Sequence, residues 1–214
     1  FKNCPIGVFD SGIGGLTVVK ELLKIMPYED IIYFGDTARL PYGSKSNRLI
    51  TRFSVENSIF LNSKNVKMIV VACNTASSVA LNELREKFDV PIIGMINPGV
   101  KMALEFSQNK RIGVIGTYAT TNNKAYSNEL LKRASDINVM EKPCPLFVPL
   151  AEEGWIDHKA TELIAEEYLK DLITAGIDTL ILGCTHYPIL SGIIQKVMGD
   201  NVTLIDSGTA AARE

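Results

Sequence analysis

The stretch that decides the fold reads MIVVACNT and covers residues 68–75. It opens with an uninterrupted apolar run, which is typical of a parallel-sheet strand that is buried on both faces. A polar end follows at once, in Cys73, Asn74 and Thr75. The stretch 178–185, which reads DTLILGCT, repeats the pattern of an apolar run that ends in Cys-Thr. One α/β unit is therefore expected to occur twice in the chain.

The segments around these two stretches alternate between short apolar runs and helical spacing, which is typical of a parallel sheet covered by helices. The run IGVIGT at 112–117 also echoes IGVFDS at 6–11. We expect an α/β fold of two pseudo-symmetric domains with mainly parallel sheets, residues 1–97 and 98–206, joined at the turn-forming run Asn97-Pro98-Gly99. In the first domain the expected strands are 6–9, 31–34, 68–72 and 91–96, and the expected helices are 16–26, 48–62 and one that follows Cys73 and reaches Phe88.

Composition excludes several classes of protein. The 214 residues carry 22 Lys and Arg against 24 Asp and Glu, a formal net charge of −2. A general nucleic-acid binder needs a basic surface to displace counterions, so we expect no nucleic-acid partner. No apolar run approaches the roughly 18 residues of a membrane span, and the first residues lack the features of a signal peptide. A soluble, cytoplasmic protein with no membrane partner is expected.

The four cysteines fall into two groups. Their spacing fits neither a disulfide framework nor a zinc finger, and Cys4 and Cys144 are expected to be small buried apolar residues. Cys73 and Cys184 stand where a buried strand ends and a helix or turn begins, a place where ligands bind and where thiolates are favoured. Two thiols on opposite faces of one carbon could remove a proton and return it from the other side. From the residues alone, two unrelated core cysteines remain the alternative.

Polar and glycine residues surround both expected strand ends. Asp10 and Ser11 close the first strand, and the glycines at 12, 14 and 15 let the backbone approach a ligand closely. Their order is not a dinucleotide-binding motif, but a glycine turn before a helix suits a carboxylate. Hydrogen-bond donors stand beside the thiols at Asn74, Thr75, Thr185 and His186, whereas His158 has no such neighbours and is expected at the surface.

Four motifs carry a family resemblance. The chain reads IGVFDSGIGGL at 6–16, GDTARLPYG at 35–43, VACNTA at 71–76 and GCTHYP at 183–188. In this order, and spread over essentially the whole chain, the motifs closely resemble those of the bacterial glutamate racemases. The resemblance implies two pseudo-symmetric α/β domains with the active site in the cleft between them, and catalysis without a cofactor or a metal.

The resemblance also implies residue roles. Cys73 matches the thiol that works on D-glutamate and Cys184 the thiol that works on L-glutamate. Asp10 and His186 match the residues that assist the first and second thiol, and Glu152 in LAEEG (150–154) matches a further assisting position. The matching substrate-binding positions are Asp10, Ser11, Pro41, Tyr42, Gly43, Asn74, Thr75, Thr117, Thr120, Thr185 and His186.

The expected function is therefore cofactor-independent racemisation of glutamate, which supplies D-glutamate for peptidoglycan, in a homodimer. No Schiff-base lysine motif offers pyridoxal phosphate as an electron sink. Carboxylates at Asp10 and Glu152 would raise the thiol pKa values, in opposition to the helix starts, and the sequence leaves open which effect is larger. Alternatives are an aspartate racemase of the same superfamily, a metal-dependent hydrolase with Cys73, Cys184 and His186 as ligands, and a non-enzymatic regulator.

The two ends of the chain differ from those of the family. The chain starts at Phe1 and stops at Glu214, whereas family members continue through elements that return to the first domain. We expect a processed or partial chain in which residues 207–214 return to the first domain.

Overall fold

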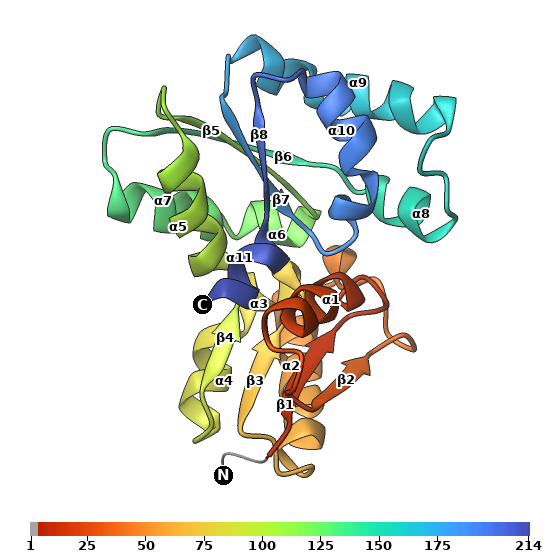
Figure 1. Ribbon diagram of the computed structural model, residues 1–214, viewed down its shortest axis with the longest axis vertical. Coiled ribbons are helices and arrows are strands. Elements are labelled where there is room, and N and C mark those ends of the chain that lie inside the picture. Colours follow the sequence, from red (N-terminus) through yellow and green to blue (C-terminus); the bar gives the residue numbers. More distant parts are fainter. Residues whose placement is uncertain (1–3) are drawn as a thin grey trace.

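Two four-stranded parallel sheets form the framework of the computed structural model, which describes residues 4–214 (Figure 1). Residues 1–3, which the first expected domain includes, lie outside the described residues. The first sheet has the order β2-β1-β3-β4, with β1 at Ile6–Asp10, β2 at Ile31–Gly35, β3 at Met68–Val71 and β4 at Ile92–Gly94. The second has the order β6-β5-β7-β8, with β5 at Arg111–Gly116, β6 at Asn138–Pro143, β7 at Thr179–Gly183 and β8 at Thr203–Asp206. The same strand order in both sheets confirms the expected repeat.

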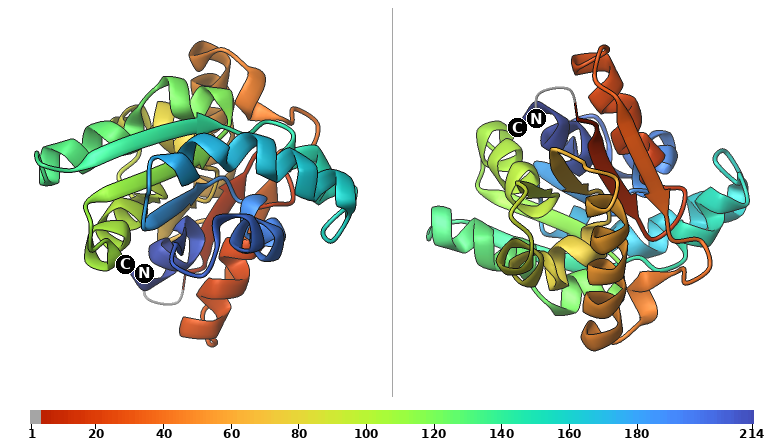
Figure 2. Two further views of the ribbon diagram at one scale, coloured as in Figure 1. Left: turned by 90° about the horizontal axis from the view of Figure 1, so that it is seen from above. Right: turned by 90° about the horizontal axis from the view of Figure 1, so that it is seen from below.

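Helices lie on both sides of each sheet (Figure 2). Those that accompany the first sheet are α1 (Leu16–Ile25), η1 (Tyr42–Ser44), α2 (Asn47–Asn62), α3 (Asn74–Val79) and α4 (Leu81–Lys87). The remainder are α5 (Ile96–Phe106), α6 (Tyr118–Asn122), α7 (Ala125–Arg133), α8 (Phe147–Glu152), α9 (Lys159–Thr174), η2 (Tyr187–Leu190), α10 (Ser191–Met198) and α11 (Ser207–Arg213). The single helix expected from Cys73 to Phe88 is broken at Ala80 into α3 and α4.

The central strands are buried because helices cover both of their faces. All residues of β1 and β7 are buried, and β3 is buried from Ile69 onward. The parallel register pairs Phe9 with Val71 in the first sheet and Gly116 with Gly183 in the second. Strand β3 ends two residues before Cys73 and strand β7 ends one residue before Cys184, so both thiols lie at the same edge of their sheets.

The turn expected at residues 97–99 is a helix in the structure. Asn97, Pro98 and Gly99 form the first turn of α5, and the preceding strand ends at Gly94. Proline is tolerated in the first helical turn because the N–H groups there have no partner within the helix. Helix α5 packs against α7, β7 and β8, so the chain enters the second half directly after β4.

Helix α11 lies where the two sheets approach each other (Figure 1). It packs against both α1 and α5, so residues 207–213 contact elements of both halves. Asp206 caps this helix by accepting the N–H of Gly208 at 2.8 Å.

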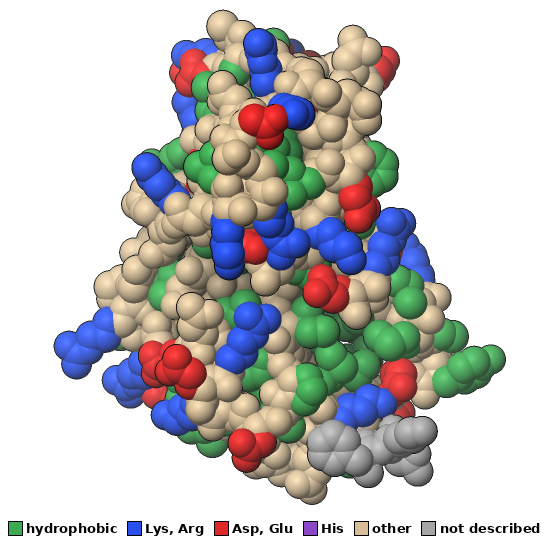
Figure 3. Space-filling model, turned by 90° about the vertical axis from the view of Figure 1, so that its left-hand side faces the viewer, with side chains coloured by type: hydrophobic (Ala, Val, Ile, Leu, Met, Phe, Trp, Pro, Cys, Tyr) green, Lys and Arg blue, Asp and Glu red, His purple; other side chains and the backbone are tan. Residues whose placement is uncertain are grey.

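Strands β6 and β8 are not among the sequence-based expectations. Both lie at edges of the second sheet, and β6 carries Glu141 and Lys142 instead of an apolar run. Lys, Arg, Asp and Glu side chains mix near mid-height on the face that bears α5 and α7 (Figure 3). Among residues 4–214, no helix is long and apolar enough to cross a membrane.

Candidate active site

A cavity lies between the two halves of the molecule. The first half contributes residues from the ends of β1 and β3 and from the loop before α2, and the second contributes residues that follow β5 and β7 and residues of α8. The lining residues are Ser11, Gly12, Leu40, Pro41, Tyr42, Gly43, Cys73, Asn74, Thr75, Thr117, Val148, Glu152, Cys184, Thr185 and His186.

The cavity brings together all but two of the site residues that the sequence predicts. Asp10 and Thr120 are fully buried and do not line it. Sequence reasoning missed Leu40 and Val148 as lining residues and noted Gly12 only for its backbone. Leu40 stands inside a quoted motif, but an apolar residue such as Val148 carries no signal that separates a cavity wall from ordinary core.

Cys73 lies at the start of α3. Its sulfur accepts the N–H of Ala76 at 3.4 Å and lies 3.7 Å from the hydroxyl of Ser11. Burial raises the pKa of this thiol to about 12, and the charge of Asp10 acts in the same direction, whereas the hydrogen bonds from Ala76 and Ser11 oppose it. Burial therefore outweighs the helix start, and the resting thiol is protonated at neutral pH.

Asp10 ends β1 beneath the glycine turn. Its Oδ2 accepts the N–H groups of Gly12 at 3.3 Å and Gly15 at 2.9 Å. The other oxygen, Oδ1, is buried and has no hydrogen-bond partner among the described residues. The glycine turn thus holds the carboxylate of this chain's own Asp10. A side chain at Gly15 would place Cβ 2.5 Å from that of Asp10, which explains the glycine there.

Cys184 lies beside a histidine–carboxylate pair. Its sulfur is 3.8 Å from Nδ1 of His186, whose Nε2 is 3.0 Å from Oε1 of Glu152. Burial raises the pKa of the Cys184 thiol; the backbone N–H of His186 opposes this shift, and the charges of Cys73, Asp10 and Glu152 add to it. Both thiols that line the cavity are therefore held in the protonated form by burial.

Three threonine hydroxyls join the two halves beside the cavity. Thr75 lies 2.9 Å from Thr117 and 3.1 Å from Thr120, and the last two are 3.1 Å apart. Gly43 packs directly on Thr117, because an added Cβ would lie 2.5 Å from the Thr117 Cβ. These contacts place donors and acceptors of both halves on one wall.

A polar network supports Tyr42 from behind. The hydroxyl of Tyr42 donates to buried Asp36 and accepts a hydrogen bond from Asn57 at 3.1 Å. Arg39 in turn donates to Asp36 and Asn57, and its guanidinium lies over the ring of Phe53. The loop that carries Pro41 and Gly43 is thereby fixed against α2.

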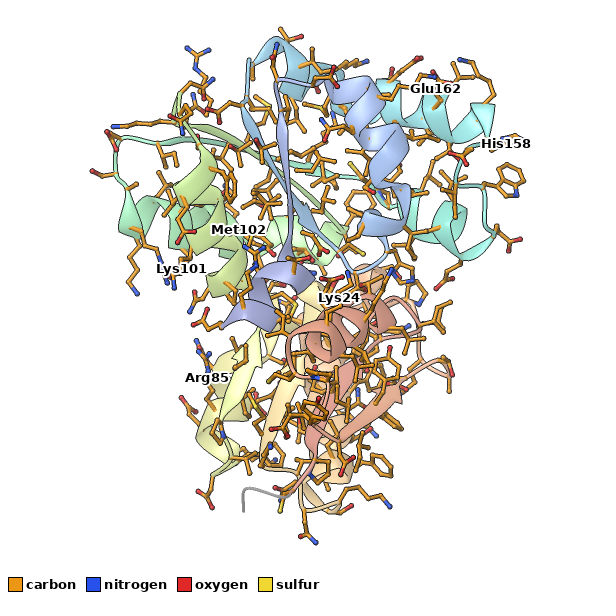
Figure 4. All side chains as sticks on the ribbon, viewed as in Figure 1. Lys24, Arg85, Lys101, Met102, His158 and Glu162 are labelled. Carbon is orange, nitrogen blue, oxygen red and sulfur yellow. The ribbon has the colours of Figure 1, made fainter. Side chains whose placement is uncertain are left out.

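The remaining sequence-based expectations concern single residues. His158 lies at the outer rim of the second half (Figure 4), where it is exposed and accepts the N–H of Ala160 at the start of α9. Cys144 is buried as expected, whereas Cys4 is only partly buried. Within residues 4–214, no three His, Cys, Asp or Glu side chains are grouped so that they could hold a metal ion.

Two similar α/β units with one thiol on each side of a shared cavity form the arrangement that a two-thiol amino-acid racemase requires. A family model described as Asp/Glu/Hydantoin racemase matches residues 18–214, and this chain belongs to that family.

Curated proteins with similar sequences are named glutamate racemase. A glutamate racemase of Persephonella marina is 55% identical over 97% of this chain and 79% of its own length. Another, of Geobacter metallireducens, is 50% identical over 97% of this chain and 77% of its own length.

Solved structures agree as well. A glutamate racemase isoform of Bacillus anthracis superposes with a TM-score of 0.97 at 39% identity, covering 100% of this chain and 80% of that one. The glutamate racemase of Francisella tularensis, in complex with D-glutamate, gives 0.94 at 45% identity, covering 100% and 80%. A Picrophilus torridus aspartate racemase, at 18% identity and a TM-score of 0.67, shares the fold alone.

Proposed function

We propose that this protein is a glutamate racemase that interconverts L- and D-glutamate by proton transfer at Cα between two thiols, without a cofactor. The observation that carries the proposal is that Cys73 and Cys184, at corresponding ends of two repeated sheets, line one cavity. Glutamate is favoured over aspartate because relatives named glutamate racemase reach 55% identity, whereas the aspartate racemase compared above stands at 18%.

The reaction proceeds by removal and return of one proton. With D-glutamate, the thiolate of Cys73 takes the Cα proton and becomes a thiol, and the thiol of Cys184 delivers its proton to the opposite face and becomes a thiolate. With L-glutamate the roles are reversed. The raised pKa of Cys73 makes its thiolate rare but strongly basic, which suits the very weakly acidic Cα–H.

Two assisting residues would accept protons from the thiols and return them. Asp10, whose Oδ1 is buried without a partner among the described residues and whose charge acts on Cys73, would accept the proton of that thiol. His186, between Cys184 and Glu152, would exchange a proton with the second thiol. The side chains of Ser11, Asn74, Thr75, Thr117 and Thr185 would bind the carboxylates and the amine of the substrate.

Stabilisation of the carbanion-like transition state would come from these fixed donors around the substrate. Racemisation by this chain would supply D-glutamate for peptidoglycan in the cytoplasm, and we propose a homodimer as the functional unit, as the family resemblance implies.

Circular dichroism of L- and D-glutamate solutions tests the function. The wild type should bring both to the racemate, and Cys73→Ser and Cys184→Ser should each lose at least about 10²-fold in rate, because an alcohol is a far weaker proton carrier at these positions. Cys144→Ser, which removes a buried thiol outside the cavity, is the matched control and should retain activity.

The outcomes separate the parts of the proposal. No change of either glutamate solution by the wild type would contradict the function, and faster turnover of aspartate would contradict the substrate. Full activity of Cys73→Ser or of Cys184→Ser would contradict the two-thiol mechanism. A requirement for added pyridoxal phosphate would contradict cofactor independence.

A further inference from the structure

We propose that Tyr126 is a positioning residue that sets the separation of the two thiols, an inference that rests on the proposed racemase function. Tyr126 belongs to α7 of the second half and is fully buried. It does not line the cavity. Its side chain nevertheless contacts a residue adjacent to each cysteine.

The hydroxyl of Tyr126 reaches the first half. It donates a hydrogen bond of 2.6 Å to Oδ1 of Asn74, the residue that follows Cys73 and begins α3. Because Asn74 shares a peptide bond with Cys73, a shift of this contact moves the backbone that carries the first thiol. Figure 1 shows α3 and α7 on the two sides of the junction between the halves.

The ring of Tyr126 packs against the strand that carries the second thiol. At Gly183, the residue before Cys184, an added Cβ would lie 3.2 Å from Cε2 of Tyr126 and 2.7 Å from the carbonyl oxygen of Ile115. On its other edge, an added Cβ at Gly99 would lie 3.2 Å from Cε1 of the tyrosine. An added Cβ at either glycine would press on the ring, so the ring packs closely against the end of β7.

A second path of hydrogen bonds also connects Asn74 to strand β7. Nδ2 of Asn74 donates to the hydroxyl of Ser207 at 3.1 Å, and Ser207 donates to the carbonyl of Leu182 at 3.2 Å. Leu182 lies in β7, two residues before Cys184. The amide of Asn74 is thus tied to the end of β7 through a tyrosine on one side and a serine on the other.

Tyr126 is itself held in place by the edge strand of its sheet. Glu141 of β6 accepts hydrogen bonds from both the N–H and the hydroxyl of Ser127, the next residue in α7. Lys124 before this helix has a positive φ of 50° and makes no side-chain cap, so Glu141 takes over the capping role. These hydrogen bonds fix the start of α7, and with it the backbone that carries Tyr126 towards Asn74.

The separation of the two thiols affects proton removal and inversion differently. Proton removal needs one thiol within reach of Cα, whereas inversion needs both within reach at the same time. A displacement of about 1 Å at a reacting group can lower a rate by about 10²-fold. Loss of the Tyr126 hydroxyl should therefore impair inversion more than proton removal by one thiol.

The test compares two rates in deuterium oxide. Exchange of the Cα proton is followed by nuclear magnetic resonance, and inversion by circular dichroism, for the wild type and for Tyr126→Phe and Ser207→Ala. We expect inversion to fall by about tenfold in Tyr126→Phe, which loses one buried hydrogen bond, and by at least as much in Ser207→Ala, which loses two. In both variants the ratio of exchange to inversion should rise clearly. Tyr168→Phe removes a hydroxyl that accepts the N–H of Leu146 in the same half, and it should leave the ratio unchanged.

Each outcome decides a separate question. An equal loss of exchange and inversion, or behaviour like that of Tyr168→Phe, would overturn the positioning role of Tyr126. A thermal melt checks folding, and if Tyr126→Phe does not fold, the ratio measured for Ser207→Ala decides. Failure of the wild type to racemise glutamate would instead overturn the proposed function and would be visible before any variant is compared.

Discussion

At the scale of single residues, burial determines the state of both cavity thiols. Cys73 is 5% exposed and Cys184 7% exposed, and desolvation is the largest cause of the raised pKa in each. Each thiol also begins a helical or turn segment, which favours the thiolate but contributes less. The consequence is a pair of thiols that are protonated at rest and strongly basic once deprotonated.

The raised pKa of Cys73, about 12, predicts a pH dependence of stability. A thiol in the unfolded chain loses its proton near pH 8.5, whereas the folded protein keeps it, so alkaline pH favours unfolding. The stabilisation is complete below the unfolded pKa and is lost as pH rises towards 12. Between pH 9 and 11 the free energy of unfolding of the wild type should fall relative to Cys73→Ser by up to about 1.4 kcal/mol per pH unit.

Urea unfolding of both proteins at a series of pH values measures this difference. A difference that stays constant from pH 8 to 11 would contradict the protonated, buried state of Cys73.

At the scale of elements, the turn between β1 and α1 approaches the second half closely. An added Cβ at Gly14 would lie 2.5 Å from Oγ1 of Thr185 and 2.7 Å from Nδ1 of His186. Thr17, in the first turn of α1, also donates to the carbonyl of Thr185 at 3.3 Å. The start of α1 therefore sets the position of the segment that follows Cys184.

Gly14→Ala should displace this segment, because the added methyl group would overlap Thr185 and His186 unless they move. We expect a loss of racemisation of at least about tenfold, since His186 shifts relative to Cys184. Gly192→Ala in α10 is the matched control, because an added Cβ there meets nothing within 4 Å. It should leave activity unchanged and stabilise the protein by up to about 1 kcal/mol. Equal activity of the two variants would show that the close approach at Gly14 has no catalytic consequence.

At the scale of the whole molecule, hydrogen bonds join the two halves at several places. The hydrogen bonds among Thr75, Thr117 and Thr120 and those of Asn74 are buried, whereas a pair of side-chain amides forms hydrogen bonds at the surface. Asn47, at the start of α2, donates to Oδ1 of Asn123 at 2.8 Å, and Asn123, after α6, donates back at 3.3 Å. This reciprocal pair joins the two halves at the surface.

Asn47→Ala and Asn123→Ala should each weaken closure of the two halves around the substrate. A hydrogen bond of about 0.5–1.5 kcal/mol predicts a rise in KM of about two- to tenfold. Steady-state kinetics of the single and double variants gives the check, because residues that act through one contact are not additive. A double variant whose effect equals the product of the single effects would show that the pair does not act as one contact.

Much of the fold was predictable because it depends on local patterns. Continuous apolar runs predict β1, β3, β5 and β7, and their repetition predicts two similar sheets. Edge strands β6 and β8 were missed because half-exposed strands with charged residues lack such a run. The turn expected at residues 97–99 was wrong because proline and glycine occur both in turns and, as in α5, in the first turn of a helix.

From the residue pattern alone, the cavity was predictable where the chain carries polar residues at strand ends. Tyr42, Gly43 and Glu152, which also line it, were expected only from the family resemblance. Cys73, Asn74 and Thr75 follow their strand directly, so their place at the sheet edge follows from the pattern. Tyr126 lies 52 residues from Asn74 in the chain, and nothing local marks it as that residue's partner.

The sequence by itself determined the repeated α/β unit, the two special cysteines and the polar residues beside them, because strand periodicity and strand-end chemistry are local properties of the chain. Only the tertiary structure decided that burial outweighs the helix starts at the thiols, that the glycine turn binds Asp10, and that Tyr126 joins the neighbours of both cysteines. Desolvation and contacts between distant segments depend on what packs around a residue, and packing exists only once the two halves have met.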